Sequence, residues 1–279
     1  MQRGNMAARM VKGSTSINEM EDSMTKNVTV EINEGICVLK LSRLESLNAL
    51  NTELVKDLDD FLEAIRKNSK VRVLIVVGDE HFAAGADIKD MLECDEEQAA
   101  DFSFASTFQK LYELEIPTIA AIEGYALGGG LELALTCDLR VVSRKAKMGF
   151  PETGLGIMPG AGGTVITPRL IGESKALELI LMGTILDGEE AYRIGLVNKI
   201  VEPGQAFNEA MLWANKLVKG APLALKTAKK TIRDSLKSGN YQDGLQIELK
   251  NWSKLFATGD QKEGMRAFIE KRKAEYKGI

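Results

Sequence analysis

An apolar strand followed by a glycine-rich loop occurs twice in this chain, and this pattern constrains its fold more than any other feature. Val71–Val77 is rich in β-branched residues, and the loop from His81 to Asp87 follows it. Thr118–Ile122 is a second apolar run, which leads through Gly128–Gly130 into Leu131–Cys137. That last segment is apolar on nearly every side, which is typical of a buried helix. Apolar strands that alternate with helices indicate a parallel sheet with right-handed crossovers, so the sequence predicts the α/β class.

Hydrophobic periodicity predicts the elements around this pattern. Alternation with period two predicts a hairpin with strands over Val28–Ile32 and Ile36–Leu41. A helix follows with Asn51 as its N-cap, and a further helix is expected over Glu96–Glu115. Leu139–Val142 is expected to be another strand.

The ends of the chain differ in character from this α/β part. Residues 1–26 are polar and rich in methionine, and we interpret them as a disordered or non-native tail. From Asp187 onward the pattern is mainly helical, and the class changes near residue 203 without a Pro/Ser-rich linker. Asp187 and Asp260 each precede a glutamate by three residues, which predicts an N-cap at both.

One apolar stripe in the C-terminal part has two interpretations. It consists of Leu245, Leu249, Trp252 and Phe256, which are spaced to share one helix face. The stripe packs against its own domain in one interpretation and forms a subunit interface in the other.

Composition excludes several protein classes. The 279 residues carry 36 basic and 40 acidic side chains, and the net charge of −4 argues against a general nucleic-acid binder. The three cysteines (Cys37, Cys94 and Cys137) cannot form a complete disulfide framework, which favours a reducing, cytoplasmic compartment. The only histidine, His81, rules out a His-rich metal centre, and we expect no metal. No apolar run approaches the ~18 residues of a membrane span, so no membrane association is expected.

Two glycine-rich loops, Phe82–Ile88 and Glu123–Glu132, each follow a strand. Small residues allow a ligand to approach the backbone, and a helix start offers free N–H groups. Two such loops that face one point can give two N–H donors to a developing oxyanion. The alternative is tight packing of a strand against a helix. Neither Gly124–Gly130 nor Gly160–Gly163 matches the GxGxxG or Walker A pattern, so nucleotide-dependent chemistry is not expected.

Two glutamates lie in uncharged surroundings. Glu132 is flanked by leucine and alanine, and Glu152 follows Phe150-Pro151. Apolar surroundings raise the pKa of a carboxyl group, which suits proton transfer near neutral pH. The alternative is that each glutamate caps a helix or pairs with Arg140 or Arg144.

Five segments together carry a resemblance to a known family. They are Phe82–Lys89, Gly124–Ala134, Pro151–Glu152, Leu155–Thr164 and Phe256–Lys273. In order and spacing they resemble the crotonase superfamily and, within it, the enoyl-CoA hydratases. The resemblance covers nearly the whole chain outside the N-terminal tail.

This resemblance implies a fold, a ligand and an assembly. It implies a crotonase-like core of ββα spiral turns over residues 27–202 and a C-terminal helical region over residues 203–279. That region builds a homotrimer or homohexamer and completes the acyl-CoA site. The implied ligand is an acyl-CoA thioester of fatty acid metabolism, as in β-oxidation, and no separate cofactor is expected because coenzyme A is part of the substrate.

The resemblance also assigns the site. Its oxyanion-hole amides correspond to Ala86 and Gly129, and its two hydratase carboxylates to Glu132 and Glu152. Glu132 is expected to activate the water that adds to trans-2-enoyl-CoA, and Glu152 to protonate C2 of the product, 3-hydroxyacyl-CoA. The substrate-binding residues implied are Ala84, Ala86, Asp87, Ile88, Lys89, Gly128, Gly129 and Gly160.

The chain departs from the family pattern at two places. The proline that often precedes Asn48-Ala49-Leu50 is missing. Val165, Ile166 and Thr167 stand where hydratases usually show Gln-Arg-Leu. The second departure bears on acyl specificity or on packing near Glu152.

Three alternatives to a simple hydratase follow. One is Δ3,Δ2-isomerisation, although many isomerases of the family lack one of the two acids. Another is hydration or dehydration of a special acyl-CoA. The third is a non-catalytic acyl-CoA-binding or RNA-binding protein, for which the only local support is a basic helix face of Lys226, Lys229, Lys230 and Arg233. Lys89 and the basic tail with Lys277 are candidate contacts of the CoA phosphates.

Overall fold

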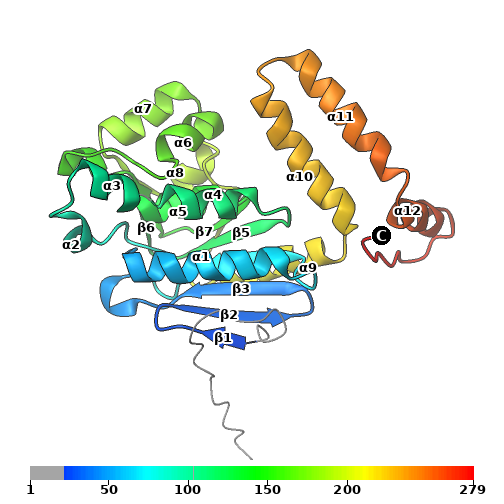
Figure 1. The fold of residues 1–279 in the computed structure, drawn as a ribbon, viewed down its shortest axis with the longest axis horizontal. Coiled ribbons are helices and arrows are strands. Elements are labelled where there is room, and N and C mark those ends of the chain that lie inside the picture. Colours follow the sequence, from blue (N-terminus) through cyan, green and yellow to red (C-terminus); the bar gives the residue numbers. More distant parts are fainter. Residues whose placement is uncertain (1–21, 103) are drawn as a thin grey trace, which may run out of the picture.

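The structure is a computed structural model that describes residues 22–102 and 104–279, and its main element is a seven-stranded sheet (Figure 1). The strand order is β1-β2-β3-β4-β5-β7-β10. β1, β2 and β3 pair antiparallel, whereas β3, β4, β5, β7 and β10 run parallel. The strands are β1 (Asp22–Met24), β2 (Val28–Asn33), β3 (Ile36–Leu41), β4 (Val73–Val77), β5 (Thr118–Ile122), β7 (Leu139–Ser143) and β10 (Lys199–Val201). The predicted α/β class is confirmed.

The predicted N-terminal hairpin is present as β2 and β3. Val28 pairs with Leu41 and Asn33 with Ile36, and Glu34-Gly35 makes the turn with positive φ at both residues. Residues 1–26 were interpreted as a tail, and the first 21 of them lie outside the described residues. The last part of this segment contains strand β1. The limits of the three predicted regions stay a prediction.

Helices cover both faces of the sheet, which explains why all of β4 is buried. Leu74 and Val76 pack on the side of α1 (Thr52–Lys67), α4 (Ala105–Glu113) and α5 (Gly129–Thr136). The alternate residues Val73, Ile75 and Val77 pack against the alanines of α9 (Ala206–Val218). The predicted cap of α1 is confirmed, because Asn51 Oδ1 accepts a hydrogen bond from the Leu54 amide at 3.0 Å.

The helix predicted over Glu96–Glu115 is wrong in its extent. The structure has two helices there, α3 (Glu96–Phe102) and α4. The apolar side chains that a helix here can bury begin only at Phe104. Phe108 and Leu111 of α4 are buried, whereas the described side chains of α3 are exposed.

A second, three-stranded sheet positions the later loops. It consists of β6 (Tyr125–Leu127), β8 (Lys147–Gly149) and β9 (Ile185–Asp187), with β6 parallel to β8 and β8 antiparallel to β9. The helices of this part are α6 (Gly163–Ile171), α7 (Glu173–Leu181) and α8 (Gly188–Arg193). Asp187 caps α8 as predicted, since its side chain accepts from the Glu190 amide at 2.9 Å.

The C-terminal region adds α10 (Pro222–Lys237), α11 (Tyr241–Leu255) and α12 (Gly259–Ile269), which lie beside the sheet (Figure 1). Asp138 joins this region to the core: Lys229 Nζ and Arg233 both lie 2.7 Å from its carboxylate. Asp138 also accepts hydrogen bonds from Thr118. Two of the four cations of the basic face proposed for RNA, Lys229 and Arg233, therefore face inward toward Asp138.

The N-cap predicted at Asp260 is wrong. Thr258 caps α12 and accepts from the Gln261 amide at 3.2 Å. Asp260 is buried and its carboxylate instead accepts from the amides of Lys277 and Gly278 at 2.7 and 2.9 Å. This contact spans 17 residues, so a local capping pattern cannot reveal it.

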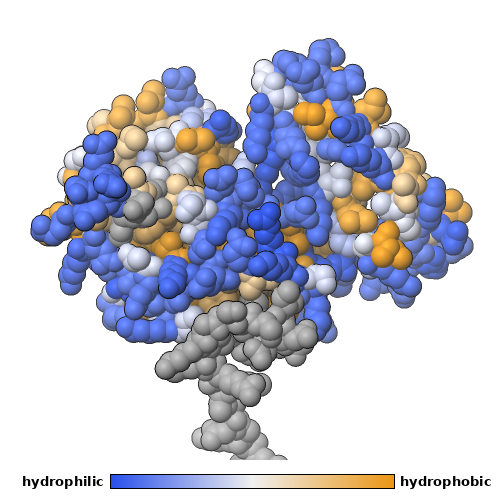
Figure 2. Space-filling view, in the orientation of Figure 1, coloured by the Kyte–Doolittle hydropathy of each residue, from blue (hydrophilic) through white to orange (hydrophobic). Residues whose placement is uncertain are grey.

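The predicted apolar stripe of α11 is only partly covered by its own chain, since Leu245 and Phe256 are each 38% exposed. Trp252 is 56% exposed and Leu249 58% exposed. Figure 2 shows apolar side chains at the surface of the C-terminal region. Its own chain therefore covers the ends of the stripe more than its middle, and both interpretations of the stripe stay predictions.

Candidate active site

The first glycine loop is held in place by the chain before α1. The Leu50 amide donates to the Gly85 carbonyl at 2.7 Å, and the Asp87 amide donates to the Leu50 carbonyl at 2.8 Å. These two bonds flank Ala86 and fix its peptide plane. Gly85 has φ +110°, and a Cβ there would lie 3.2 Å from the Leu127 carbonyl oxygen, so glycine is required.

The second loop is bonded to the first. The Ala83 amide donates to the Tyr125 carbonyl at 2.9 Å, and the Leu127 amide donates to the Ala83 carbonyl at 3.1 Å. Gly128 then turns with φ +49°, and α5 begins at Gly129. The backbone therefore brings the start of α5 against the first loop.

Two amides meet where these loops touch. A Cβ on Gly129 would lie 3.7 Å from the Ala86 nitrogen. Within residues 22–102 and 104–279, neither the Ala86 amide nor the Gly129 amide has a hydrogen-bond acceptor. Two neighbouring unused donors, one of them at a helix N-terminus, form an arrangement suited to a developing oxyanion.

Glu132 lies one turn further along α5 and is 3% exposed. Its Oε1 accepts hydrogen bonds from the Ala161 amide at 2.7 Å and from the Gly163 amide at 2.8 Å. Burial raises the pKa of this carboxyl group, and the amides of Gly163, Ala161 and Gly160 oppose that rise. The carboxylate is thus oriented by the backbone with its ionised form partly stabilised.

Glu152 begins the 3-10 turn Glu152–Leu155, which follows β8, and is 8% exposed. Its Oε2 is buried and has no hydrogen-bond partner in the described part of the chain. Burial raises its pKa to about 7, and the charge of Glu132 adds to the rise. A carboxyl group with this pKa is half protonated near neutral pH and can donate a proton.

Neither carboxylate makes the structural ion pair that offered an alternative role. Arg140 donates to the carbonyls of Leu196 and Cys137. Arg144 pairs with Glu189 and with Glu202. Glu132 and Glu152 are therefore two buried acids that interact with each other and have no basic partner within the described chain.

The remaining predicted substrate-binding residues lie in or next to the first glycine loop, or in the loop whose amides donate to Glu132. Ala84 donates its amide to the Leu47 carbonyl at 3.1 Å, and Asp87 pairs with Arg43 at 2.9 Å while capping α2 (Ile88–Met91). The Asp87 carboxylate thus has a structural role. Ile88 and Lys89 are exposed on α2, beside the loop. Gly160 lies in the loop that orients Glu132.

The amides of Ala161 and Gly163 are functional groups that the sequence did not single out. The available signal was the run Pro159-Gly160-Ala161-Gly162-Gly163, which is small enough to fold closely around a carboxylate. A Cβ on Gly163 would lie 3.1 Å from Glu132 Oε1, so this position has little room for a side chain.

His81 is a loop-packing residue. Its ring stacks on Tyr125 with the ring centroids 4.6 Å apart, and its Nδ1 accepts from the Tyr125 amide at 3.1 Å. It therefore supports the approach of the two loops and does not enter the carboxylate pair.

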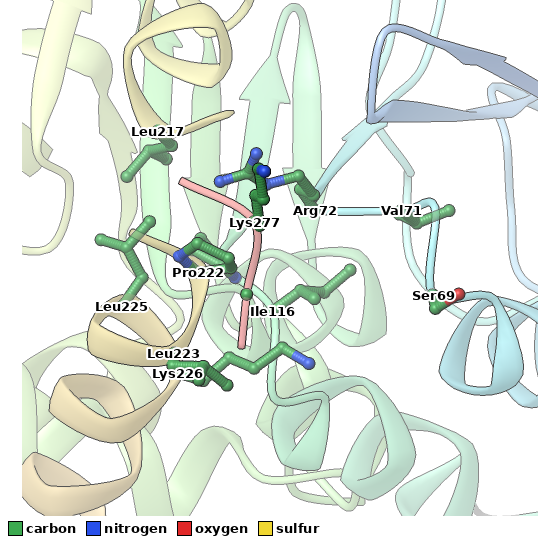
Figure 3. Close-up of a pocket in the computed structure, with 12 residues that line it drawn as sticks. Ser69, Val71, Arg72, Ile116, Leu217, Pro222, Leu223, Leu225, Lys226 and Lys277 are labelled. Atoms are coloured by element: carbon green, nitrogen blue, oxygen red, sulfur yellow. The ribbon is translucent and has the colours of Figure 1, made fainter. Parts of the chain in front are cut away.

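A cavity of about 340 Å³ lies between the core and the C-terminal region, but it is separate from this site (Figure 3). Arg72, Ile116 and Lys277 are among its lining residues. Arg72 and Ile116 precede β4 and β5, whereas the glycine loops follow these strands, so the cavity lies at the opposite edge of the sheet. Lys277 is therefore not at the candidate site of its own chain, and Arg272 of the basic tail pairs with Glu263.

Two further observations concern the described residues only. They hold no group of three or more His, Cys, Asp or Glu side chains placed to bind a metal ion. None of the helices formed by them has the length and apolar character that a membrane span needs.

Known proteins share this sequence and fold. A family model described as enoyl-CoA hydratase/isomerase matches residues 31–279. A short-chain-enoyl-CoA hydratase of Clostridium acetobutylicum is 42% identical over 253 residues, which are 89% of this chain and 97% of the relative. A mitochondrial methylglutaconyl-CoA hydratase of Mus musculus is 39% identical over 96% of this chain and 87% of the relative. The crystal structure of an enoyl-CoA hydratase from Bacillus anthracis is 37% identical with a TM-score of 0.86, and the match covers 91% of this chain and 100% of that structure.

Proposed function

The chain belongs to the enoyl-CoA hydratase/isomerase family, and from this premise we propose that it hydrates trans-2-enoyl-CoA to 3-hydroxyacyl-CoA. The observation that carries the proposal is the pair of buried acids, Glu132 and Glu152, beside two unused backbone amides. Hydration needs one group to take a proton from water, one to give a proton to carbon, and donors for the negative charge between these steps.

The two amides serve the thioester oxygen. As water adds to C3, the electron pair of the double bond moves toward C2 and the thioester oxygen. The N–H groups of Ala86 and Gly129 then donate to an oxygen that carries more charge than it does in the substrate. An interaction of this kind lowers the barrier, by roughly 3–4 kcal/mol for each well-placed donor.

The two glutamates divide the proton transfers. Glu132 is held by backbone amides in a form that accepts a proton, so it takes one proton of the attacking water. Glu152 has a pKa of about 7 and gives its proton to C2. The pair begins and ends with one proton, which must return to Glu152 before the next cycle. No cofactor takes part, because coenzyme A belongs to the substrate.

The proposal extends to assembly. The exposed apolar stripe of α11, with Leu249 and Trp252 at its centre, supports association of several copies into a trimer or hexamer. Sedimentation of the full chain tests this part separately from the activity.

The test of the function is the absorbance of a conjugated enoyl thioester. Purified full-length protein should remove that absorbance when it is mixed with crotonyl-CoA. When it is mixed with 3-hydroxybutyryl-CoA, it should produce the same absorbance by the reverse reaction, dehydration. A 3-enoyl-CoA that gains the absorbance faster than crotonyl-CoA loses it would favour the isomerase. Binding of crotonyl-CoA without any change in absorbance would favour a special acyl-CoA substrate or a non-catalytic protein.

A further inference from the structure

One face of α5 leads away from the reacting groups. Gly129, Glu132 and Thr136 are spaced three and four residues apart and therefore share that face. Thr136 lines a cavity of about 640 Å³. Four residues of helix span ~6 Å, so the cavity begins about that far along the helix axis from Glu132.

The cavity and the Glu132 carboxylate also share a wall. Gly160 and Ala161 line the cavity, and the Ala161 amide is one of the two that donate to Glu132 Oε1, at 2.7 Å. A substrate with its thioester oxygen at the amides of Ala86 and Gly129 and its C3 beside Glu132 would extend its acyl chain along this face toward Thr136.

The walls of the cavity are mostly apolar, and three helices besides α5 contribute to them. Phe108 lies on α4, Val165 and Ile166 on α6, and Leu236 on α10. Val165 is 52% exposed and Leu236 is 70% exposed, although both are hydrophobic. Exposed apolar side chains that line a hollow next to reactive groups are typical of a ligand pocket.

The charged residues of the described chain that line this cavity are all basic. No aspartate or glutamate of the described chain lines it, and its cations are Arg169, Arg233 and Lys237. Arg233 already pairs with Asp138. Arg169 and Lys237 are exposed to solvent.

Val165 and Ile166 are neighbouring apolar residues in the first turn of α6. Both line the cavity and form its apolar wall on α6. We propose that Val165 and Ile166 determine acyl specificity, by providing an apolar wall for the hydrocarbon chain beyond C4. The inference rests on the proposed hydratase function and names its substrate class as straight-chain enoyl thioesters of medium length.

The test compares three thioesters on the purified full chain: crotonyl-CoA, trans-2-octenoyl-CoA and an enoyl-CoA that ends in a carboxylate. The wild type should have a higher kcat/KM for octenoyl-CoA than for crotonyl-CoA. Ile166→Arg and Val165→Gln should each lower this octenoyl-to-crotonyl ratio about tenfold, the size of effect that one or two methylene contacts have on specificity. Ile166→Leu should retain the ratio. Because both rates are measured on one variant, a general loss of folded protein cancels.

Leu177→Gln is the matched control, since Leu177 is an exposed apolar residue of the neighbouring α7 and does not line the cavity. It should leave the ratio unchanged. An unchanged ratio in Ile166→Arg, a wild type that prefers crotonyl-CoA, or a preference for the carboxylate-ended thioester would each overturn the inference while the hydratase function stands. No hydration of any of the three thioesters would overturn the hydratase function as well.

Discussion

The carboxylate of Glu152 occupies the space that a side chain of Gly128 would fill. A Cβ on Gly128 would lie 2.9 Å from Glu152 Oε1, and Gly128 itself has φ +49°. The residue that turns the chain into α5 is thus also the residue that admits the proposed proton donor. This relationship ties the glycine loop, the Gly129 amide and Glu152 into one site.

Gly128→Ala should lower kcat/KM for crotonyl-CoA more than tenfold, because the new methyl group displaces Glu152 and the positive φ strains the turn. Gly128 has ψ −125° and so lies outside the left-handed helical region, and this strain alone costs about 1–3 kcal/mol of stability. Gly195→Ala is the matched control, since Gly195 has φ +82° and nothing within 4 Å of its Cβ position. It should lose some stability from its positive φ and leave kcat/KM unchanged. Equal kcat/KM values for the two variants would contradict the role of Gly128.

The pH dependence of activity should reveal the pH at which the carboxylate pair loses its proton. Glu152 has a pKa of about 7, so kcat/KM for crotonyl-CoA should fall as pH rises through about 7 and the pair loses its proton. Hydration and dehydration both need the singly protonated pair, so both directions should show the same decline. Rate profiles between pH 5 and 9 check this, and an increase in kcat/KM through this range would contradict the assignment.

Glu152 should also make folding stability depend on pH. Its folded pKa of about 7 lies above its ordinary value of 4.5, so the folded state binds the proton more tightly. The contribution of Glu152 to stability is therefore present below pH 4.5 and is lost as pH rises toward 7. Glu152→Gln should gain stability relative to the wild type, on the order of 2–3 kcal/mol more at pH 8 than at pH 4.5. Urea unfolding at fixed protein concentration measures the difference, and an equal difference at both pH values would argue against a buried, unpaired Glu152.

Asp138 should be essential for holding α10 on the core. Asp138→Asn leaves Lys229 and Arg233 without their anion, and burial already lowers the pKa of Lys229. Loss of one partner of such a pair costs about 3–5 kcal/mol. Asp234→Asn, whose partner Lys230 is largely exposed, should cost less than about 1 kcal/mol. Similar unfolding midpoints for the two variants would show that Asp138 has no special role.

The parts of the fold that depend on buried periodicity could be predicted from the sequence. β4 and β5 are apolar because helices cover both of their faces, and α1 has a clear stripe and a cap at Asn51. The three-residue strands of the second sheet, such as β6 and β8, were not predicted, because so short a segment has no readable period. The partner of Asp260 was missed because it lies in the chain beyond α12.

The site was predictable to the extent that it depends on residue type. Glu132 and Glu152 were singled out because charged side chains in apolar surroundings are costly, and the structure places both in buried positions. The backbone partners of Glu132 were not predicted, because almost any residue type can supply a backbone amide. The only trace in the sequence is small residues such as Gly163. The wall formed by Val165 and Ile166 became visible only through the packing of α6 beside α4 and α10.

The most direct measurement of the central claim separates binding from turnover in Glu132→Gln and Glu152→Gln. Each variant should hydrate crotonyl-CoA 10²–10⁴-fold more slowly than the wild type, the usual contribution of a general acid or base. Each should still bind a saturated acyl-CoA in calorimetry, because Ala86 and Gly129 are untouched. Glu53→Gln, an exposed change on α1, should behave as the wild type. Wild-type turnover in both active-site variants would contradict the claim that these two carboxylates carry the reaction.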